Sequence, residues 1–253
     1  MAAKSGCRGG VKRERTDVAY RVGRGRCARG IASREGTAMM IAVVGSGGKT
    51  TYIREQAKLY REQGKRVLVT TTTHMYAEPD TLFTNDSAEI CVCLESKGYC
   101  MAGQRAEETD PSASGDSGHI CAGRSEQVSG QTEGSRAKIR ALSADVLAQA
   151  AQCADIVLVE ADGSRGKPVK YPAEHEPVIP VAADVIVIVM GFFAVGQTIE
   201  QACHRPELVC ACLGVTPAHH LTEQDLQKLV EEGYRKPLAR QYPHAKIICR
   251  KTL

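Results

Sequence analysis

A glycine-rich turn with a lysine and two threonines stands near residue 45 of the 253-residue chain. It contains Gly45, Ser46, Gly47, Gly48, Lys49, Thr50 and Thr51. Glycines let backbone N–H groups turn toward one point, and a following helix and the Lys49 ammonium add positive charge that attracts phosphates. Thr50 would supply a hydroxyl to Mg²⁺. The turn therefore predicts a binding site for a nucleotide, ATP or GTP, together with Mg²⁺.

The spacing of this turn differs from the common phosphate-binding loop. The common pattern is G-x-x-x-x-G-K-[ST], and its first glycine would fall at Val43. The spacing here is G-x-x-G-K-T-T, which resembles the shorter loop of ATPases of the Mur-ligase type. This resemblance keeps open an ATP-dependent ligase or kinase that acts on a small-molecule acceptor.

Four threonines and a histidine, Thr70–His74, end a second apolar stretch. We predict that Thr72, Thr73 and His74 lie beside the glycine-rich turn, where they donate hydrogen bonds to phosphate or hold Mg²⁺-bound water. Threonine also favours β-strands, so a plain strand is the alternative for the run. A structural role is the alternative for His74.

Two carboxylates, Glu160 and Asp162, close a third apolar stretch. Alternation along a strand would put both on the same face, and a carboxylate at the end of a buried strand destabilises the fold unless a metal or cation pairs with it. We predict that one of them holds Mg²⁺ with Thr50 while the other orients a nucleophile, with Lys49 as the third catalytic group. The residues do not say which carboxylate has which role. The alternative is an ion-paired Glu160 and a helix-capping Asp162.

A proline-rich charged segment follows these carboxylates. It contains Lys167, Lys170, Glu174, His175 and Glu176. Prolines restrict its backbone, the two lysines and Arg165 offer contacts to anions, and the carboxylates flank an imidazole. We predict a loop that binds the acceptor substrate or senses phosphate. Metal binding by the Glu-His-Glu triplet is less favoured, because adjacent residues of an extended chain point in opposite directions. A solvated loop is the third alternative.

Apolar runs and helical spacing predict the elements that position these residues. The predicted strands are residues 39–44, 66–73, 88–94, 155–159, 184–190 and 245–249. The predicted helices are residues 49–63, 137–153 and 222–232, the last capped by Thr222. The alternation predicts an α/β fold, a parallel sheet with helices on both faces. Ligands of such sheets bind at the carboxyl ends of the strands, where the residues above stand.

Composition divides the chain into three parts. The net charge of +4 comes from residues 1–38, which hold ten basic and three acidic residues. We predict a disordered basic extension there, or a start at Met39 or Met40, and one nucleotide-binding domain over residues 39–253. Within it, the Gly- and Ser-rich residues 95–135 are predicted to form a disordered insertion or a lid. The chain stops soon after its last predicted strand, so a truncated end is also expected.

The same composition excludes several classes of protein. A content of 43% hydrophobic and 25% charged residues excludes a wholly disordered chain. The longest apolar run, residues 185–195, is too short to span a bilayer, and the mildly acidic body gives no reason to expect a nucleic-acid partner. The chain has eleven cysteines without a C-x-x-C pair, which we interpret as reduced thiols in a cytoplasmic protein.

Five ordered motifs resemble those of the YqeC family. They are GSGGKTT at 45–51, VTTTTH at 69–74, VEADGS at 159–164, KPVKYPAEHEPVIP at 167–180 and HRPE at 204–207. The family is that of selenium-dependent molybdenum hydroxylase accessory proteins, also called selenium cofactor biosynthesis proteins. The resemblance covers about Met40 to the end. It implies a fold like that of P-loop NTPases and a partner that is a molybdenum hydroxylase or its cofactor precursor.

These observations predict a Mg²⁺-dependent nucleotide-binding protein that hydrolyses its nucleotide slowly. The resemblance implies that it is an accessory factor in the maturation of selenium-dependent molybdenum hydroxylases. A ligase or kinase, and a nucleotide-gated scaffold without turnover, are the alternatives.

Overall fold

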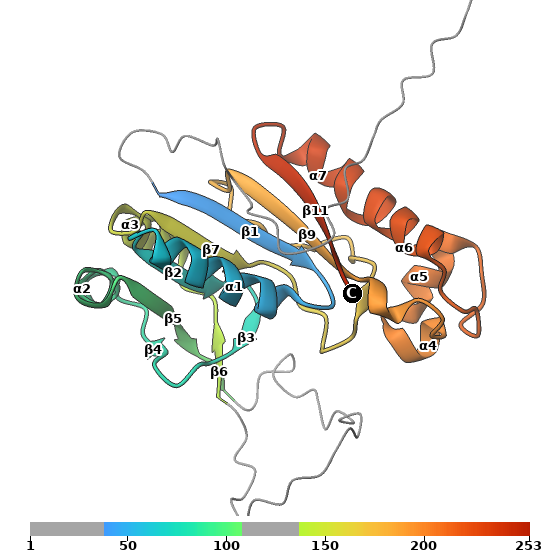
Figure 1. The fold of residues 1–253 in the computed structure, drawn as a ribbon, viewed down its shortest axis with the longest axis horizontal. Coiled ribbons are helices and arrows are strands. Elements are labelled where there is room, and N and C mark those ends of the chain that lie inside the picture. Colours follow the sequence, from blue (N-terminus) through green and yellow to red (C-terminus); the bar gives the residue numbers. More distant parts are fainter. Residues whose placement is uncertain (1–37, 108–136) are drawn as a thin grey trace, which may run out of the picture.

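The computed structural model describes residues 38–107 and 137–253, which form an α/β fold around one sheet of parallel and antiparallel strands (Figure 1). Its strands are β1 (Met39–Gly45), β2 (Val67–Thr71), β3 (His74–Tyr76), β4 (Leu82–Phe83), β5 (Tyr99–Arg105), β6 (Lys138–Arg140), β7 (Ile156–Glu160), β9 (Val185–Gly191) and β11 (Lys246–Thr252). The strand order is β11-β9-β1-β7-β2-β5-β6-β3, and β4 pairs with β5. A separate two-stranded sheet joins β8 (Val169–Lys170) to β10 (Cys203–His204).

Strands β11, β9, β1, β7, β2 and β5 run parallel to one another. Strands β1, β2, β7 and β9 are buried along their whole length, as the unbroken apolar runs predict. The register places Glu160 opposite Val43 of β1 on one side and Thr71 of β2 on the other. The ends of three neighbouring strands therefore bring the predicted chemical groups to one edge of the sheet.

Helices cover both faces of this sheet. They are α1 (Lys49–Glu62), α2 (Ser87–Lys97), α3 (Ala144–Gln152), α4 (Ile199–Ala202), α5 (Pro206–Leu213), α6 (Glu223–Val230) and α7 (Lys236–Gln241), with a 3₁₀ turn at Phe192–Ala194 and a π turn at Glu231–Arg235. Helix α1 packs on one face, and α2, α3, α6 and α7 pack on the other (Figure 1). Alternate residues of β1 serve the two clusters: Ile41 and Val43 face α1, whereas Ala42 and Val44 face away from it.

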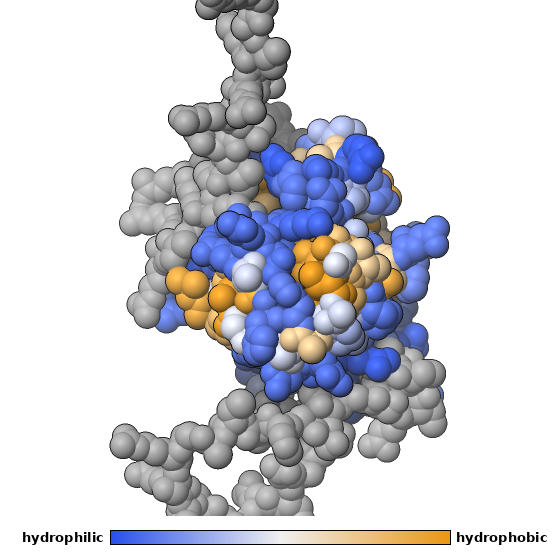
Figure 2. Space-filling model, turned by 90° about the vertical axis from the view of Figure 1, so that its right-hand side faces the viewer, coloured by the Kyte–Doolittle hydropathy of each residue, from blue (hydrophilic) through white to orange (hydrophobic). Residues whose placement is uncertain are grey.

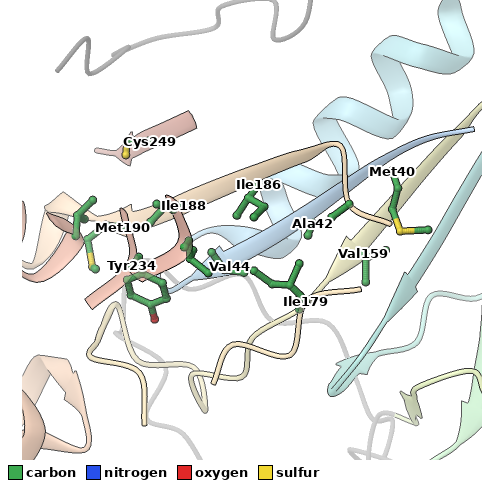
Figure 3. Close-up of a cluster of buried hydrophobic side chains, with 14 of the residues drawn as sticks. Met40, Ala42, Val44, Val159, Ile179, Ile186, Ile188, Met190, Tyr234 and Cys249 are labelled. Atoms are coloured by element: carbon green, nitrogen blue, oxygen red, sulfur yellow. The ribbon is translucent and has the colours of Figure 1, made fainter. Parts of the chain in front are cut away.

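The cluster that contains Ala42 and Val44 also includes apolar residues of α6 and α7. Figure 3 shows part of this cluster. Helix α6 begins after Thr222, which forms the predicted cap in a reciprocal arrangement with Asp225. The π turn that follows places the fully buried Tyr234 toward the same end of the cluster as Val44 and Met190 (Figure 3). Figure 2 shows the side of the molecule on which α4, α5 and α6 lie, and hydrophilic residues cover most of it. Helix α6 buries Leu226, Leu229 and Val230 and turns polar residues outward, whereas hydrophobic patches remain elsewhere on this side.

The predicted strand at 88–94 is wrong, because these residues belong to α2. Asp86 caps this helix by accepting a hydrogen bond from the Ala88 amide. Ile90 and Leu94, one helical turn apart, are both buried. The local apolar content was high enough for either element, and the cap and this spacing favour the helix.

The predicted helix at 137–153 is correct only from Ala144, where α3 begins. Residues 138–140 form strand β6, which pairs antiparallel with β5 and β3. The prediction that structure is absent from residue 95 onward is also wrong for residues 95–107, which complete α2 and form β5. Cys100, Met101 and Ala102 of β5 are buried, although they do not belong to the most hydrophobic residue types. The rest of the predicted insertion, and residues 1–37 of the predicted basic extension, lie outside the described residues.

The interpretation of all cysteines as reduced thiols is wrong for one pair. Cys91 of α2 and Cys153, directly after α3, form a disulfide across 62 residues of sequence. The packing of α2 against α3 brings them together, which no local spacing reveals. In the described ranges, no helix is long and apolar enough to cross a membrane.

Candidate functional site

A cleft of about 640 Å³ lies at the carboxyl edge of the sheet. Its walls come from residues 47–51, 73–76, 163–167 and 204–205, and from Lys138, Glu160, His175, Glu176 and Val178. All five motifs singled out in the sequence thus contribute to one cleft. The topology explains this convergence, because the motifs follow β1, β2, β7 and β10 in turn.

The glycine loop, defined as residues 45–51, joins β1 to α1 in a conformation that requires its glycines. Gly45, Gly47 and Gly48 all have positive φ. A Cβ at Gly45 would lie 2.0 Å from the Val189 carbonyl oxygen, and one at Gly47 would lie 2.6 Å from that of Pro168. Within the described residues, no side chain caps the first turn of α1. The loop thus leaves the start of α1 without a side-chain acceptor, as an anion site at a helix N-terminus requires.

Lys49, Thr50 and Glu160 form the polar floor beside this loop. Lys49 is 5% exposed; its Nζ donates to the Gly45 carbonyl at 2.9 Å and lies 4.0 Å from Glu160 Oε1. Thr50 Oγ1 donates to Glu160 Oε2 at 3.0 Å. Burial raises the pKa of Glu160, against the opposing effects of the Lys49 charge and the Thr50 hydrogen bond. A positive ligand beside Glu160 would relieve the cost of keeping this carboxylate ionised.

Asp162 has different surroundings from Glu160. Its carboxylate accepts hydrogen bonds from the Gly45 amide at 3.1 Å, from the Tyr234 hydroxyl at 2.8 Å and from Lys170 Nζ. Strand β7 ends at Glu160, so the alternation that predicts a shared face does not extend to Asp162. Asp162 therefore fixes the start of the glycine loop through the Gly45 amide, and protein groups donate hydrogen bonds to both of its carboxylate oxygens.

The oxygen atoms of this floor suit a Mg²⁺ ion that is also bound by phosphate and water, rather than a metal ion held by protein side chains alone. In the part of the chain that the structure describes, no group of three His, Cys, Asp or Glu side chains could hold a metal ion. Mg²⁺ is commonly held by one or two protein oxygens together with phosphates and water. Thr50 Oγ1 and the Glu160 carboxylate provide such a pair.

The first three threonines of the run have structural roles, whereas Thr73 and His74 face the cleft. The hydroxyls of Thr70, Thr71 and Thr72 donate to the carbonyls of Ala102, Glu160 and Val178, at 2.8, 2.7 and 2.6 Å. The plain-strand alternative accounts for Thr70 and Thr71, which lie in β2, whereas Thr72 follows the strand and its hydroxyl is engaged by the Val178 carbonyl. Thr73 and His74 line the cleft, where a ligand would meet them.

The proline-rich segment likewise contains a buried structural residue and residues that line the cleft. Lys170 is completely buried and binds Asp162, Glu176 and the Gly163 carbonyl, so it is not a surface for anions. Lys167, His175 and Glu176 line the cleft, whereas Glu174 is exposed and is not among the lining residues. Lys167 Nζ donates to the Gln201 carbonyl at 2.8 Å.

A buried ion network connects the two walls of the cleft. We use this name for Asp162, Lys170, Glu176 and Arg205. Lys170 lies between the two carboxylates, and Arg205 donates to both oxygens of Glu176. Burial alone would raise the pKa of Glu176, but hydrogen bonds from Arg205 and Lys170 outweigh it and lower the pKa to about 2. The network therefore holds Glu176 as a carboxylate at all physiological pH values.

Sequence reasoning gave no role to two groups that the structure brings to this site. His204 lines the cleft together with Arg165, and Tyr234 anchors Asp162 from the C-terminal π turn. His204 and Arg205 occur in a motif that carries the resemblance, which was the available signal for them. Tyr234 stands 72 residues from Asp162, so no local pattern could associate the two.

The cleft as a whole is electropositive. Its lining includes five Lys or Arg side chains, at residues 49, 138, 165, 167 and 205, against the two carboxylates Glu160 and Glu176. A concave surface with this excess of positive charge attracts polyanions. The fold and the cleft thus define an α/β protein with a glycine loop at the edge of its sheet and a basic cleft above it.

Comparison with known proteins identifies the family. The family model described as YqeC protein matches residues 41–207, which include all five motifs. The chain is also 33% identical over 197 residues to the uncharacterized protein YqeC of Escherichia coli (strain K12), a match that covers 76% of this chain and 67% of that protein. The chain belongs to the YqeC family, which confirms the resemblance seen in the sequence.

Proposed function

We propose that this chain binds a nucleoside triphosphate with Mg²⁺ in the cleft and hydrolyses it slowly, as a P-loop NTPase-like protein. The observation that carries the proposal is the glycine loop beside Lys49, Thr50 and Glu160 at the end of a buried parallel strand. A helix start without a side-chain cap, a buried ammonium and paired oxygen donors are what a polyphosphate with a divalent cation requires.

The described residues have distinct roles in this proposal. Lys49 Nζ exchanges the Gly45 carbonyl for a phosphate oxygen, which is a stronger, charge-assisted partner. Thr50 and Glu160 hold Mg²⁺, which neutralises phosphate charge when bound. Asp162 keeps the Gly45 amide in place and so maintains the shape of the loop.

Slow hydrolysis of the nucleotide is consistent with the low basicity of a carboxylate that lines the cleft. Apart from Glu160, the carboxylate that lines it is that of Glu176, with a pKa of about 2. A carboxylate with so low a pKa is a weak base for activating water. The cleft therefore favours binding over rapid hydrolysis.

We extend the proposal to the cellular role through family membership. The protein would act as an accessory factor in the maturation of selenium-dependent molybdenum hydroxylases, with a hydroxylase or its cofactor precursor as partner. Cells in which the Lys49→Ala variant replaces the native protein should then contain hydroxylase with less selenium. Unchanged selenium content in these cells would reject this role and leave the nucleotide site unaffected.

Nucleotide binding is tested directly by calorimetry and thermal unfolding with ATP and GTP, each with and without Mg²⁺. Ligand that binds only the folded protein raises the unfolding temperature by mass action. Lys49→Ala should weaken binding at least about tenfold, because it removes a charge-assisted phosphate contact. Lys58→Ala, at an exposed position of the same helix, is the matched control. Equal affinity in the two variants would reject the assignment.

A ligase or kinase is the second candidate, because the cleft extends past the glycine loop to Arg165 and Arg205. Acceptor-dependent release of ADP would distinguish it from a hydrolase. Measurable hydrolysis that depends on Glu160 would argue against a scaffold without turnover.

A further inference from the structure

The lining of the cleft contains a second basic cluster, to which the proposed nucleotide site assigns no role. We call Arg165, His204 and Arg205 the arginine site. Arg165 follows β7, and the pairing of β10 with β8 brings His204 and Arg205 to the same wall. All three side chains line the same cleft, and the charges of Arg165 and Arg205 both act on His204.

The backbone at both arginines is in the left-handed region, which disfavours side chains. Arg165 has φ 48° and Arg205 has φ 56°. In residues 38–107 and 137–253, these are the two non-glycine residues with positive φ. Such conformations persist where the surrounding structure enforces them, and they concentrate at ligand sites. Both fall on one wall of one cleft, and both carry the side chain best suited to binding an oxyanion.

The balance of charge leaves this wall positive. In the buried ion network, the cations of Lys170 and Arg205 are matched by the carboxylates of Asp162 and Glu176. Arg165 forms no hydrogen bond or ion pair with the described residues. Lys167 beside it donates to a neutral carbonyl. Arg165 and the adjacent Lys167 therefore have no carboxylate partner among the described residues, whereas Arg205 of the arginine site is already paired with Glu176.

The protonation state of His204 is consistent with an anion-binding site. Burial, followed by the charges of Arg205, Lys170 and Arg165, lowers the pKa of His204 to about 4. The imidazole is therefore neutral at physiological pH, because another cation there would be repelled. An arriving anion would reverse this repulsion and raise the pKa of His204.

We infer that the arginine site binds a phosphomonoester group carried by a small acceptor molecule, next to the nucleotide. A phosphomonoester near neutral pH carries up to two negative charges and so matches Arg165 of this site together with the adjacent Lys167. The site is separate from the glycine loop yet close to it, because the Pro168 carbonyl contacts Gly47 and Gly191. This inference extends the proposed function by naming the class of acceptor, and the arginine site exists whether or not a nucleotide binds.

The competing arrangement is that Arg165 contacts the terminal phosphate of the nucleotide itself. The two arrangements differ in what saturating nucleotide does. A separate site still binds phosphate when a non-hydrolysable ATP analogue and Mg²⁺ occupy the glycine loop. A shared site does not.

The experiment uses inorganic phosphate as the probe and the full chain, with and without the ATP analogue. Binding is followed by calorimetry and by the NMR titration of the His204 imidazole. We expect phosphate to raise the pKa of His204 by about one unit or more in both conditions, since an opposite charge in contact has effects of this size. Loss of phosphate binding in the presence of the analogue would overturn the inference.

Arg165→Gly is the decisive variant, because glycine fits the left-handed backbone and the side chain is exposed. We expect its phosphate affinity to fall at least about tenfold, its nucleotide affinity to change less than about twofold, and its unfolding temperature to stay equal or rise. Arg240→Ala, outside the cleft, is the control. Unchanged phosphate affinity in Arg165→Gly would overturn the inference. If no nucleotide binds but phosphate binding depends on Arg165, the proposed function fails and the arginine site stands.

Discussion

Tyr234→Phe isolates one hydrogen bond deep in the structure. The Tyr234 side chain is fully buried, and its hydroxyl donates to Asp162 at 2.8 Å. Phenylalanine keeps the ring and its packing, so the variant creates no large cavity. A hydrogen bond to a charged group contributes about 2 kcal/mol, and we expect the free energy of unfolding to fall by about this amount. For a domain of this size, this corresponds to a decrease of about 4–8 °C in the unfolding temperature.

A matched control lies nearby in the same cluster. Tyr242 is also buried, and its hydroxyl donates to the neutral Ile179 carbonyl at 3.2 Å. Because this acceptor is uncharged, Tyr242→Phe should lower the free energy of unfolding by only about 1 kcal/mol. Urea unfolding at neutral pH, with the two variants beside the wild-type chain, measures both values.

The comparison also tests whether Asp162 supports the glycine loop. Asp162 accepts from Tyr234 and from the Gly45 amide through the same carboxylate oxygen. Tyr234→Phe should therefore weaken nucleotide binding several-fold, whereas Tyr242→Phe should leave it unchanged. If Tyr234→Phe is no less stable than Tyr242→Phe, Asp162 is not a charged acceptor and the reasoning about the network is refuted.

Three further perturbations probe other parts of the structure. Glu160→Gln should lower Mg²⁺-dependent hydrolysis about 10–100-fold in a phosphate-release assay, whereas a parallel loss in an exposed control, Glu62→Gln, would point to a non-specific effect. The folded pKa of Glu176 is about 2, below the ordinary 4.5, so its carboxylate contributes stability above pH 4.5 that is lost as the pH falls toward 2; a Glu176→Gln chain with the same pH dependence of unfolding would contradict this. Reduction of the Cys91–Cys153 disulfide, which spans 62 residues, should lower the free energy of unfolding by up to about 4 kcal/mol, and a chain that dithiothreitol does not destabilise would argue against the bond.

The sequence predicts the centre of the sheet well because the residues of each central strand are sufficient to indicate a buried strand. Strands β1, β7 and β9 are long apolar runs buried on both faces, and such runs have few alternatives. Helix α1 has both a glycine stop and buried residues at helical spacing. The periphery is less predictable: the α2 segment is apolar enough for a strand, and β5 is built from Cys, Met and Ala.

The candidate site shows the same division. The side chains that follow each strand could be identified from sequence, since the parallel sheet gathers strand ends at one edge. Their partners could not: Lys170 and Tyr234 engage Asp162, and Arg205 engages Glu176 from 29 residues away. A carboxylate and its distant cation leave no joint pattern in a single sequence.

The buried ion network has a thermodynamic consequence for the cleft. It links the Gly45 amide at one wall, through Asp162, Lys170 and Glu176, to Arg205 at the other. A ligand that shifts Arg205 therefore disturbs the charge pairs that hold Gly45, and the converse holds equally. Any factor by which occupancy of one wall changes affinity at the other must be identical in both directions. The Lys170→Met chain, in which the chain of contacts is interrupted, should bring that factor close to one.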